Sequence, residues 1–409
     1  MNARPAMLTL SAALLVAAAM SGRADAQGTN KNDTIKIGDI NAYKLLAANL
    51  GPYRKGIDLA LTQINGAGGL LGKKVVVISR DDGANPGKAV RVADELRTRD
   101  KVDFITGTIL SNVGLAVADY AKHSKFFFLA SAPLTDKMIW GDGNRYTFRL
   151  RPTTYSHVAA LVPHAANLKR KRWAFVYPDY EYGQSAVATF KKLLKKAQPD
   201  VEFVSDQAAP LGKIDAGAVV SALNDAKPDA VFNVLFGSDL AKFVRQGKTR
   251  HLFDHTKVVS LLTGEPEYLD PLKGDAPVGW YATGYPWYAV KAPAQVAFVK
   301  AYRKHYHDYP RMASLVGYTM MKAIAAGIKK AGSTNSEKLV NAFAGLTFNS
   351  PFGKQRFRAI DHQSTLGVFV GPIGRRNGKG VMTSFKYIPG TKLLPPDADV
   401  RKLRVAKTQ

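Results

Sequence analysis

The alternation of strand-like and helix-like segments, which occurs twice along the chain, constrains the fold more than any other feature. Strand-like segments at residues 35–40 and 75–79 are each followed by a segment whose apolar residues recur at helical spacing. The alternation continues to residue 129 and starts again after residue 152. Such alternation is typical of parallel, doubly wound sheets. We therefore predict an α/β protein with two doubly wound parallel-sheet lobes.

The first 26 residues have the pattern of a cleavable secretory signal peptide. A basic start at Arg4 is followed by an apolar core at residues 7–20 and by the small-residue triplet 24–26. No second apolar stretch of comparable length follows. We therefore predict a signal peptide over residues 1–26 and a mature protein that is soluble in the periplasm.

The composition excludes several classes of function. The chain contains no cysteine, which rules out disulfides, thiolate metal sites and cysteine nucleophiles. The formal net charge of +26 invites a nucleic-acid interpretation, yet lysine and arginine are scattered and form no basic arm with interleaved aromatic residues. We therefore expect no nucleic-acid partner. A positive field of this strength would attract small anions such as organic carboxylates.

Motifs for catalysis or metal binding are missing from the sequence. His251 and His255 lie four residues apart in a loop-like context without the zincin pattern, and no GxSxG, P-loop or GxGxxG motif occurs. The adjacent pair Asp81 and Asp82 follows a predicted strand, where neighbouring side chains point apart. The pair at residues 361–362 has no partnered nucleophile. We expect no enzymatic activity, no metal and no cofactor.

Polar residues that follow the predicted strands of the first lobe are candidates for ligand binding. In open parallel sheets, ligands bind outside the carboxyl ends of the strands. Ser111 and Asn112 follow the third strand, and Thr135 follows the fourth, each before a helix. A hydroxyl together with backbone N–H groups at a helix N-terminus can hold an anion. The alternative is that Ser111 and Thr135 only cap their helices.

The corresponding loops of the second lobe are richer in aromatic and acidic residues. Tyr182, Phe236 and Glu265 each lie directly after a predicted strand. Such residues suit a ligand whose carboxylate is fixed by the first lobe, while the two rings cover its remaining part and Glu265 meets an ammonium or hydroxyl group. Alternatively, Tyr182 packs within its own lobe and Glu265 is a solvated loop acid.

Several short segments, taken in their order and spacing, resemble one known family. They are Ile35–Gly38, Ile64–Gly72, Arg80–Asp82 followed by 85–89, Tyr182–Gly183, and 357–365. The chain resembles the periplasmic binding proteins of branched-chain amino acid (leucine/isoleucine/valine) ABC importers, which have the type I periplasmic-binding fold. The likeness spans nearly the whole mature chain.

This resemblance implies a domain organisation with three crossings between the lobes. The hinges would lie near 150–153, 283–287 and 361–367. Lobe one would comprise residues 34–150 plus 288–360, and lobe two residues 151–284 plus 366–390, followed by a C-terminal tail of low order at 391–409. Members of the family close around their ligand and deliver it to the membrane permease of an ABC importer, and by analogy we expect a monomer.

The resemblance also implies roles for individual residues. Ser111 and Thr135, with the backbone around Pro133, resemble the carboxylate clamp of the family, and Tyr182 matches a pocket tyrosine. Phe236 stands where amino-acid binders often have a tyrosine.

In the family an acid of the second lobe binds the ammonium group of the ligand, and three residues compete for that position here, namely Gly264, Glu265 and Glu267. Some members of the family bind aromatic or aliphatic carboxylates without an amine, and such a ligand would suit the aromatic residues of this chain. These are Tyr43, Tyr182, Phe236, Tyr285 and Trp287. The ligand is therefore a branched-chain or other amino acid, or an amine-free carboxylate. A ligand-sensing module for a membrane signalling receptor is the alternative to a transport receptor, because both would present a face of the closed lobes.

Overall fold

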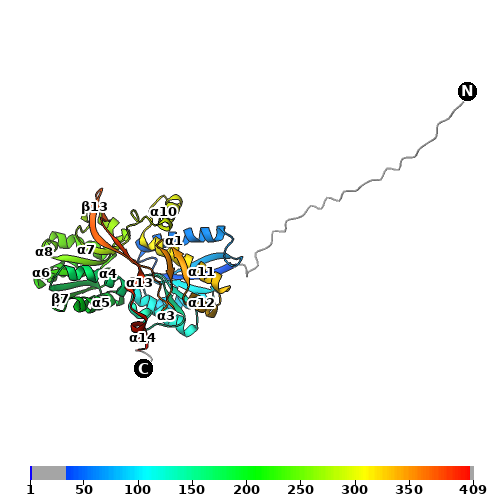
Figure 1. Ribbon diagram of the computed structural model, residues 1–409, viewed down its shortest axis with the longest axis horizontal. Helices are drawn as coiled ribbons and strands as arrows, with labels where there is room; N and C mark the ends of the chain where they lie inside the picture. Colours follow the sequence, from blue (N-terminus) through cyan, green and yellow to red (C-terminus); the bar gives the residue numbers. More distant parts are fainter. Residues whose placement is uncertain (2–33, 406–409) are drawn as a thin grey trace. The chain divides into compact units, whose positions relative to one another are not determined.

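The computed structural model describes Met1 and residues 34–405. Apart from Met1, the predicted signal peptide at residues 1–26 lies outside the described residues. Figure 1 shows the chain from residue 34 onward folded around two sheets, with α4 to α8 around one and α1, α11 and α12 around the other. We call the part with α1, α11 and α12 lobe one, and the part with α4 to α8 lobe two.

The sheet of lobe one has five parallel strands in the order β2-β1-β3-β4-β5. The strands are β1 (Thr34–Asn41), β2 (Lys74–Asp81), β3 (Phe104–Gly107), β4 (Phe128–Ala130) and β5 (Thr147–Arg149). Parallel strands need crossover connections, and helices supply them here. The predicted strand–helix alternation of the first lobe is thereby confirmed.

Helices from two distant parts of the chain pack in lobe one. They are α1 (Ala47–Gly66), α2 (Pro86–Thr98), α3 (Ser111–Ser124), α10 (Pro293–Tyr306), α11 (Met312–Ala331) and α12 (Ser336–Phe343). The backbones of α1 and α11 touch, since a Cβ atom at Gly56 would lie 2.0 Å from the Ser314 carbonyl oxygen, and one at Gly317 would lie 2.3 Å from that of Tyr53. Only glycine permits so close an approach.

The sheet of lobe two is mixed, with a parallel part and an antiparallel edge. The order is β14-β13-β10-β9-β8-β6-β7, and β15 also pairs with β13. Strands β6 to β10 are parallel, while β13 to β15 pair in antiparallel fashion. The strands are β6 (Arg172–Pro178), β7 (Glu202–Ala209), β8 (Ala230–Asn233), β9 (Lys257–Gly264), β10 (Tyr281–Gly284), β13 (Val368–Arg376), β14 (Lys379–Met382) and β15 (Lys386–Ile388).

The helices of lobe two lie before and between its parallel strands. They are α4 (Thr154–Asn167), α5 (Glu181–Ala197), α6 (Ala216–Ala226), α7 (Gly237–Thr249), α8 (Leu252–His255) and α9 (Pro266–Leu269). Short 3₁₀ turns at Asp136–Met138 and Asp270–Asp275 complete the regular structure before residue 300. The chain passes from one sheet to the other between β5 and α4 and again between β10 and α10. It passes a third time between β12 and β13, where β12 (Gly353–Arg356) forms a small hairpin with β11 (Thr347–Ser350).

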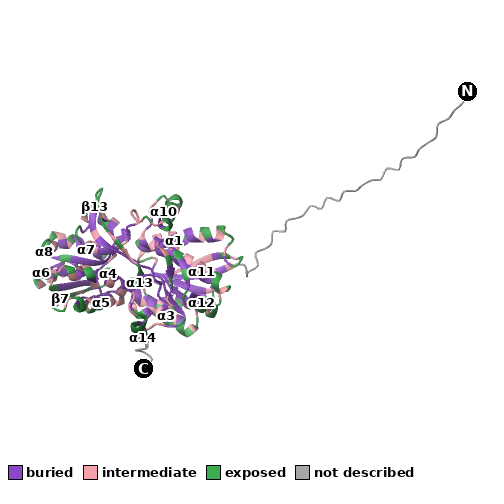
Figure 2. Cartoon of the chain, in the orientation of Figure 1, coloured by how far each residue is buried: buried purple, intermediate pink, exposed green. Residues whose placement is uncertain are grey.

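Two hydrophobic cores correspond to the two sheets. The core of lobe one includes a ring cluster in which Phe127 lies 4.7 Å from Phe343. The core of lobe two includes Phe190 stacked on Phe232 with ring centroids 3.9 Å apart. Figure 2 shows the strands of both sheets as mostly buried. Buried apolar area of this kind is the main stabilising contribution in a chain without disulfides.

The end of the chain differs from the expected tail of low order. It contains two short helices, α13 (Gly390–Leu393) and α14 (Asp397–Val405). Val400 is fully buried against the core of lobe one, and the Arg358 guanidinium donates to the Pro395 carbonyl at 2.8 Å. Over residues 390–405 the expectation was wrong, because these tertiary contacts, rather than local propensity, hold the segment. Residues 406–409 lie outside the described residues.

Candidate ligand-binding site

A pocket lies where loops that follow strands of both sheets meet. Its lining comes from segments directly after β3, β4, β5, β6 and β8, together with β9 and α9. The lining residues are Ile109, Leu110, Ser111, Ala132, Leu134, Arg151, Tyr180, Tyr182, Phe236, Leu262 and Tyr268. These positions are the carboxyl ends of parallel strands, where ligands of open α/β sheets bind.

Four aromatic rings form a continuous wall of the pocket. Tyr180 lies 6.0 Å from Tyr182, Tyr182 lies 5.9 Å from Phe236, and Phe236 lies 6.2 Å from Tyr268, each measured between ring centroids. The empty space between the lining atoms is about 340 Å³ including its open mouth. A pocket walled by aromatic rings suits a ligand with a flat apolar face.

Three helices begin at this pocket without a side-chain cap. The N-cap residues of α3, α5 and α7 are Leu110, Tyr180 and Phe236, which line the pocket and offer no capping hydrogen bond. In α2, by contrast, the Asn85 side chain accepts a hydrogen bond from the Lys88 N–H. The first N–H groups of a helix lack partners within the helix, and together with the helix dipole they favour an anion.

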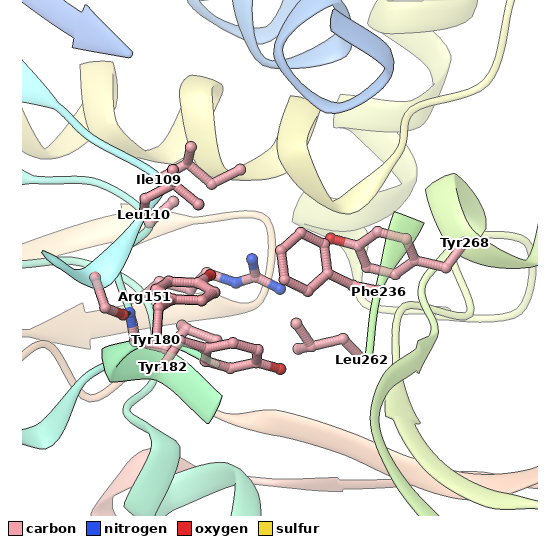
Figure 3. Close-up of a pocket in the computed structure, with 11 residues that line it drawn as sticks. Ile109, Leu110, Arg151, Tyr180, Tyr182, Phe236, Leu262 and Tyr268 are labelled. Carbon is pink, nitrogen blue, oxygen red and sulfur yellow. The ribbon is translucent and has the colours of Figure 1, made fainter. Parts of the chain in front are cut away.

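Arg151 is the charged member of the lining. It follows β5 on the first crossing between the sheets, and its guanidinium points into the cluster of rings (Figure 3). Its side chain is 7 % exposed and forms an ion pair with Glu265. The Nε of Arg151 and the hydroxyl of Tyr182 are buried without a hydrogen-bond partner. Buried donors without partners are rare and costly, so an acceptor that reached either atom would be stabilising.

The two candidate acids for a ligand ammonium group are both engaged with the protein. Burial raises the pKa of Glu265 to about 8, against the opposing effect of Arg151. The Glu267 carboxylate accepts hydrogen bonds from the N–H groups of Met312 and Ala313, at 3.0 and 2.8 Å, at the start of α11. Burial also raises the pKa of Glu267. Neither acid is a free carboxylate facing the pocket.

Three of the residues proposed from the sequence line the pocket, namely Ser111, Tyr182 and Phe236. The Ser111 hydroxyl oxygen accepts hydrogen bonds from the N–H groups of Leu134 and Thr135, at 3.3 and 3.2 Å. Ser111 thus holds the loop after β4 against the start of α3.

The other proposed residues lie outside the lining. The Thr135 hydroxyl donates to Glu181 at 2.6 Å. Pro133 is buried, and the Tyr43 hydroxyl donates to Asp39. Asn112, in the first turn of α3, has a buried side-chain oxygen without a partner. Glu265 is buried and forms an ion pair with Arg151, so it is not the solvated loop acid considered above.

Arg151, Tyr180 and Tyr268 are lining residues that sequence reasoning missed. Arg151 was interpreted as part of a hinge, but two arginines in the segment Arg149–Arg151, which connects buried elements, were a usable signal. Charged side chains are almost never fully buried unless they are paired. Tyr268 belongs to a four-residue helix that the spacing of apolar residues could not reveal.

The remaining polar motifs are structural. Asp361 forms an ion pair with Arg358 and accepts from the indole N–H of Trp140 at 3.1 Å, while His362 stacks on Phe148 at 3.9 Å. Within residues 34–405, no three acidic or histidine side chains come together as metal ligands would. In the same part of the chain, none of the helices has the length and apolarity needed to cross a membrane.

A family model described as "Periplasmic binding protein" matches residues 34–379. The chain belongs to the periplasmic binding protein family. The leucine-, isoleucine-, valine-, threonine- and alanine-binding protein of Pseudomonas aeruginosa is 27% identical over 80% of this chain and 86% of its own length. The Leu/Ile/Val-binding protein homologue 8 of Brucella abortus is 25% identical over 91% of this chain and 93% of its own.

Solved structures of periplasmic binding proteins share the fold. An ABC-transporter solute-binding protein of Rhodopseudomonas palustris, in complex with 3,4-dihydroxybenzoic acid, matches with a TM-score of 0.77 and 24% identity over 87% of this chain and 98% of its own. A second one from R. palustris, in complex with 4-hydroxybenzoate, has a TM-score of 0.78 and 22% identity over 90% of this chain and 100% of its own. The predicted fold and the predicted family are thus confirmed.

Proposed function

We propose that this protein is the periplasmic solute receptor of an ABC importer, and that its ligand is a small, planar, amine-free carboxylate such as an aromatic acid. The observation that carries the proposal is the setting of Arg151, a buried guanidinium in a pocket walled by four aromatic rings. A carboxylate would meet Arg151 and the uncapped starts of α3 and α5, and its ring would lie among Tyr182 and Phe236.

An amino acid fits this pocket less well. Its ammonium group would need a free acceptor, and burial without one is costly. Glu265 already pairs with Arg151, and Glu267 already accepts from two N–H groups of α11. The relatives named for amino-acid binding and the solved structures with benzoates show that the family includes both classes of ligand. The contacts around Arg151 in this chain favour the amine-free class.

Ligand-driven closure of the two lobes would be the mechanism. The chain crosses between the sheets three times, and the lining comes from both sides of the first crossing, where Arg151 lies. A ligand that contacts both lobes binds the closed state more tightly and shifts the population toward it. The closed form would then be presented to the permease, and the relatives described as transporter proteins favour this role over a sensory one.

A thermal-shift screen of the mature protein tests the proposal. The screen compares benzoate, hydroxybenzoates and phenylacetate with aliphatic carboxylates and with branched-chain amino acids. A ligand that binds only the folded state raises the melting temperature. We expect a shift with the aromatic acids and none with the amino acids. A shift confined to amino acids would refute the proposed ligand class, and a radius of gyration that stays constant on adding the ligand would refute closure.

A further inference from the structure

The ion pair between Arg151 and Glu265 lies in the wall of the pocket and bears on how an anion can bind there. Both side chains are buried, with exposed fractions of 7 % and 3 %; Arg151 lines the pocket, and Glu265 does not. Arg151 is the guanidinium that a ligand carboxylate would approach. The same guanidinium already has a carboxyl partner of its own.

A second anion at Arg151 would leave the site with an excess of negative charge. Glu265 and Glu267 stand next to a single guanidinium, and Glu267 already raises the pKa of Glu265. An ionised ligand would bring a third carboxylate into a buried place. Uncompensated buried charge costs several kcal/mol, so a buried carboxyl group takes up a proton instead.

We propose that Glu265 takes up one proton when an anionic ligand binds to Arg151, so that the ligand and the proton enter the site together. This inference rests on the proposed function, and it adds a role for a residue that makes no direct contact with the pocket. The carbonyl oxygen of protonated Glu265 can still accept a hydrogen bond from the Arg151 guanidinium. The proton comes from solvent, and no bond other than O–H forms.

The groups that face Glu265 determine the pH range in which the coupling is visible. They are Arg151, Glu267, Tyr182, Tyr268 and, next to Arg151, His157. Burial raises the pKa values of both tyrosines well above their usual range, and burial lowers that of His157 well below its own. These three side chains therefore stay neutral from pH 6 to 9, and Glu265 and Glu267 are the candidates for titration.

The sign of the pH effect follows from linkage. With a pKa of about 8 in the free protein, Glu265 is already protonated at pH 6, so binding takes up no proton there and the affinity is flat. The bound anion raises this pKa further, so the number of protons taken up on binding rises from about half at pH 8 to about nine-tenths at pH 9. The affinity should be about tenfold weaker at pH 9 than at pH 6, because roughly one free molecule in eleven is then protonated at Glu265.

Isothermal titration calorimetry with benzoate, phenylacetate and 3-phenylpropionate tests the inference, because each has a single carboxyl group and no other titratable group. Titrations from pH 6 to 9 at 0.15 M salt give the affinity. Pairs of buffers with different protonation enthalpies give the number of protons taken up. We expect a tenfold fall in affinity and close to one proton per ligand at pH 9.

Matched variants assign the proton to its residue. Glu265→Gln mimics the protonated side chain and should bind the same acids with an affinity that varies less than about threefold from pH 6 to 9. Glu181→Gln alters another glutamate paired with a cation, Lys137, outside the lining, and should keep the tenfold fall. Glu267→Gln tests the second candidate carboxyl group.

Several outcomes would overturn the inference. A flat affinity in the unaltered protein, absent proton uptake at pH 9, or a tenfold fall that persists in Glu265→Gln would each do so. If Glu267→Gln removes the fall and Glu265→Gln does not, Glu267 takes up the proton and the inference about Glu265 is refuted. Binding without proton uptake leaves the proposed function intact, whereas a failure of all three acids to bind refutes the proposed function and this inference with it.

Discussion

Replacing Arg151 by methionine should abolish high-affinity binding of the carboxylate. Methionine keeps the apolar stem among the rings but removes the cationic group from the pocket lining. A hydrogen bond to a charged group contributes roughly 1.5 to 3 kcal/mol, and a guanidinium can make two to one carboxylate. We therefore expect the dissociation constant to rise about 100-fold or more, which corresponds to ~2.7 kcal/mol.

The same substitution should also lower the stability of the ligand-free protein, because it leaves Glu265 buried without its cation. Removal of one partner of a buried ion pair costs about 3 to 5 kcal/mol. Burial already raises the pKa of Glu265 to about 8, so protonation reduces this cost at lower pH. The loss of stability should thus be larger at pH 8.5 than at pH 6.

A double variant separates the contact from the stability. In Arg151→Met/Glu265→Gln no charge is left unpaired, so urea unfolding at pH 8.5 should recover at least half of the lost free energy while binding stays lost. Lys137→Met removes an exposed cation, paired with Glu181 outside the lining, and should change the dissociation constant less than about twofold. Near-normal binding by the double variant, or an equal effect from Lys137→Met, would refute a direct contact with Arg151.

Two further predictions concern residues around the pocket. Ser111→Ala should weaken binding about tenfold, because it removes the acceptor of two N–H groups in the loop after β4 and so loosens that loop from the start of α3. Asp361→Ala should lower stability and leave the calorimetric dissociation constant unchanged. An equal loss of affinity in both variants would indicate a general effect on folding. Burial lowers the pKa of His157, so stability should fall as pH drops below about 6.5, where only the unfolded chain binds the proton; urea unfolding of His157→Phe should not show this fall.

The sequence predicted the fold well where local chemistry and tertiary structure agree. The apolar segment 35–40 became β1, and Asn85 with Pro86 began a helix as capping rules predict. The hairpin of β11 and β12 and the helix α14 were missed. In α14 the apolar residue Val400 is buried by contact with a distant part of the chain, and no local pattern encodes that contact.

The position of the site was predictable, but the exact set of residues was not. The rule on carboxyl ends of strands selected Ser111, Tyr182 and Phe236, which all line the pocket. It also selected Thr135, whose hydroxyl turns to Glu181 instead. The rule locates a backbone position, whereas the direction of a side chain depends on the partner that it finds. Arg151 lies on a crossing segment, so the rule did not consider it.

The way in which the ligand-free pocket satisfies its own donors links its stability to its specificity. Glu265 holds part of the Arg151 guanidinium, yet Nε of Arg151 and the Tyr182 hydroxyl stay without partners. The carboxylate of Glu265 therefore leaves these two buried donors unused. A ligand carboxylate can satisfy those donors, and the proton on Glu265 removes the competing charge. The pocket would thus discriminate by charge balance, because a zwitterion brings an ammonium group for which both nearby carboxyl groups are already engaged.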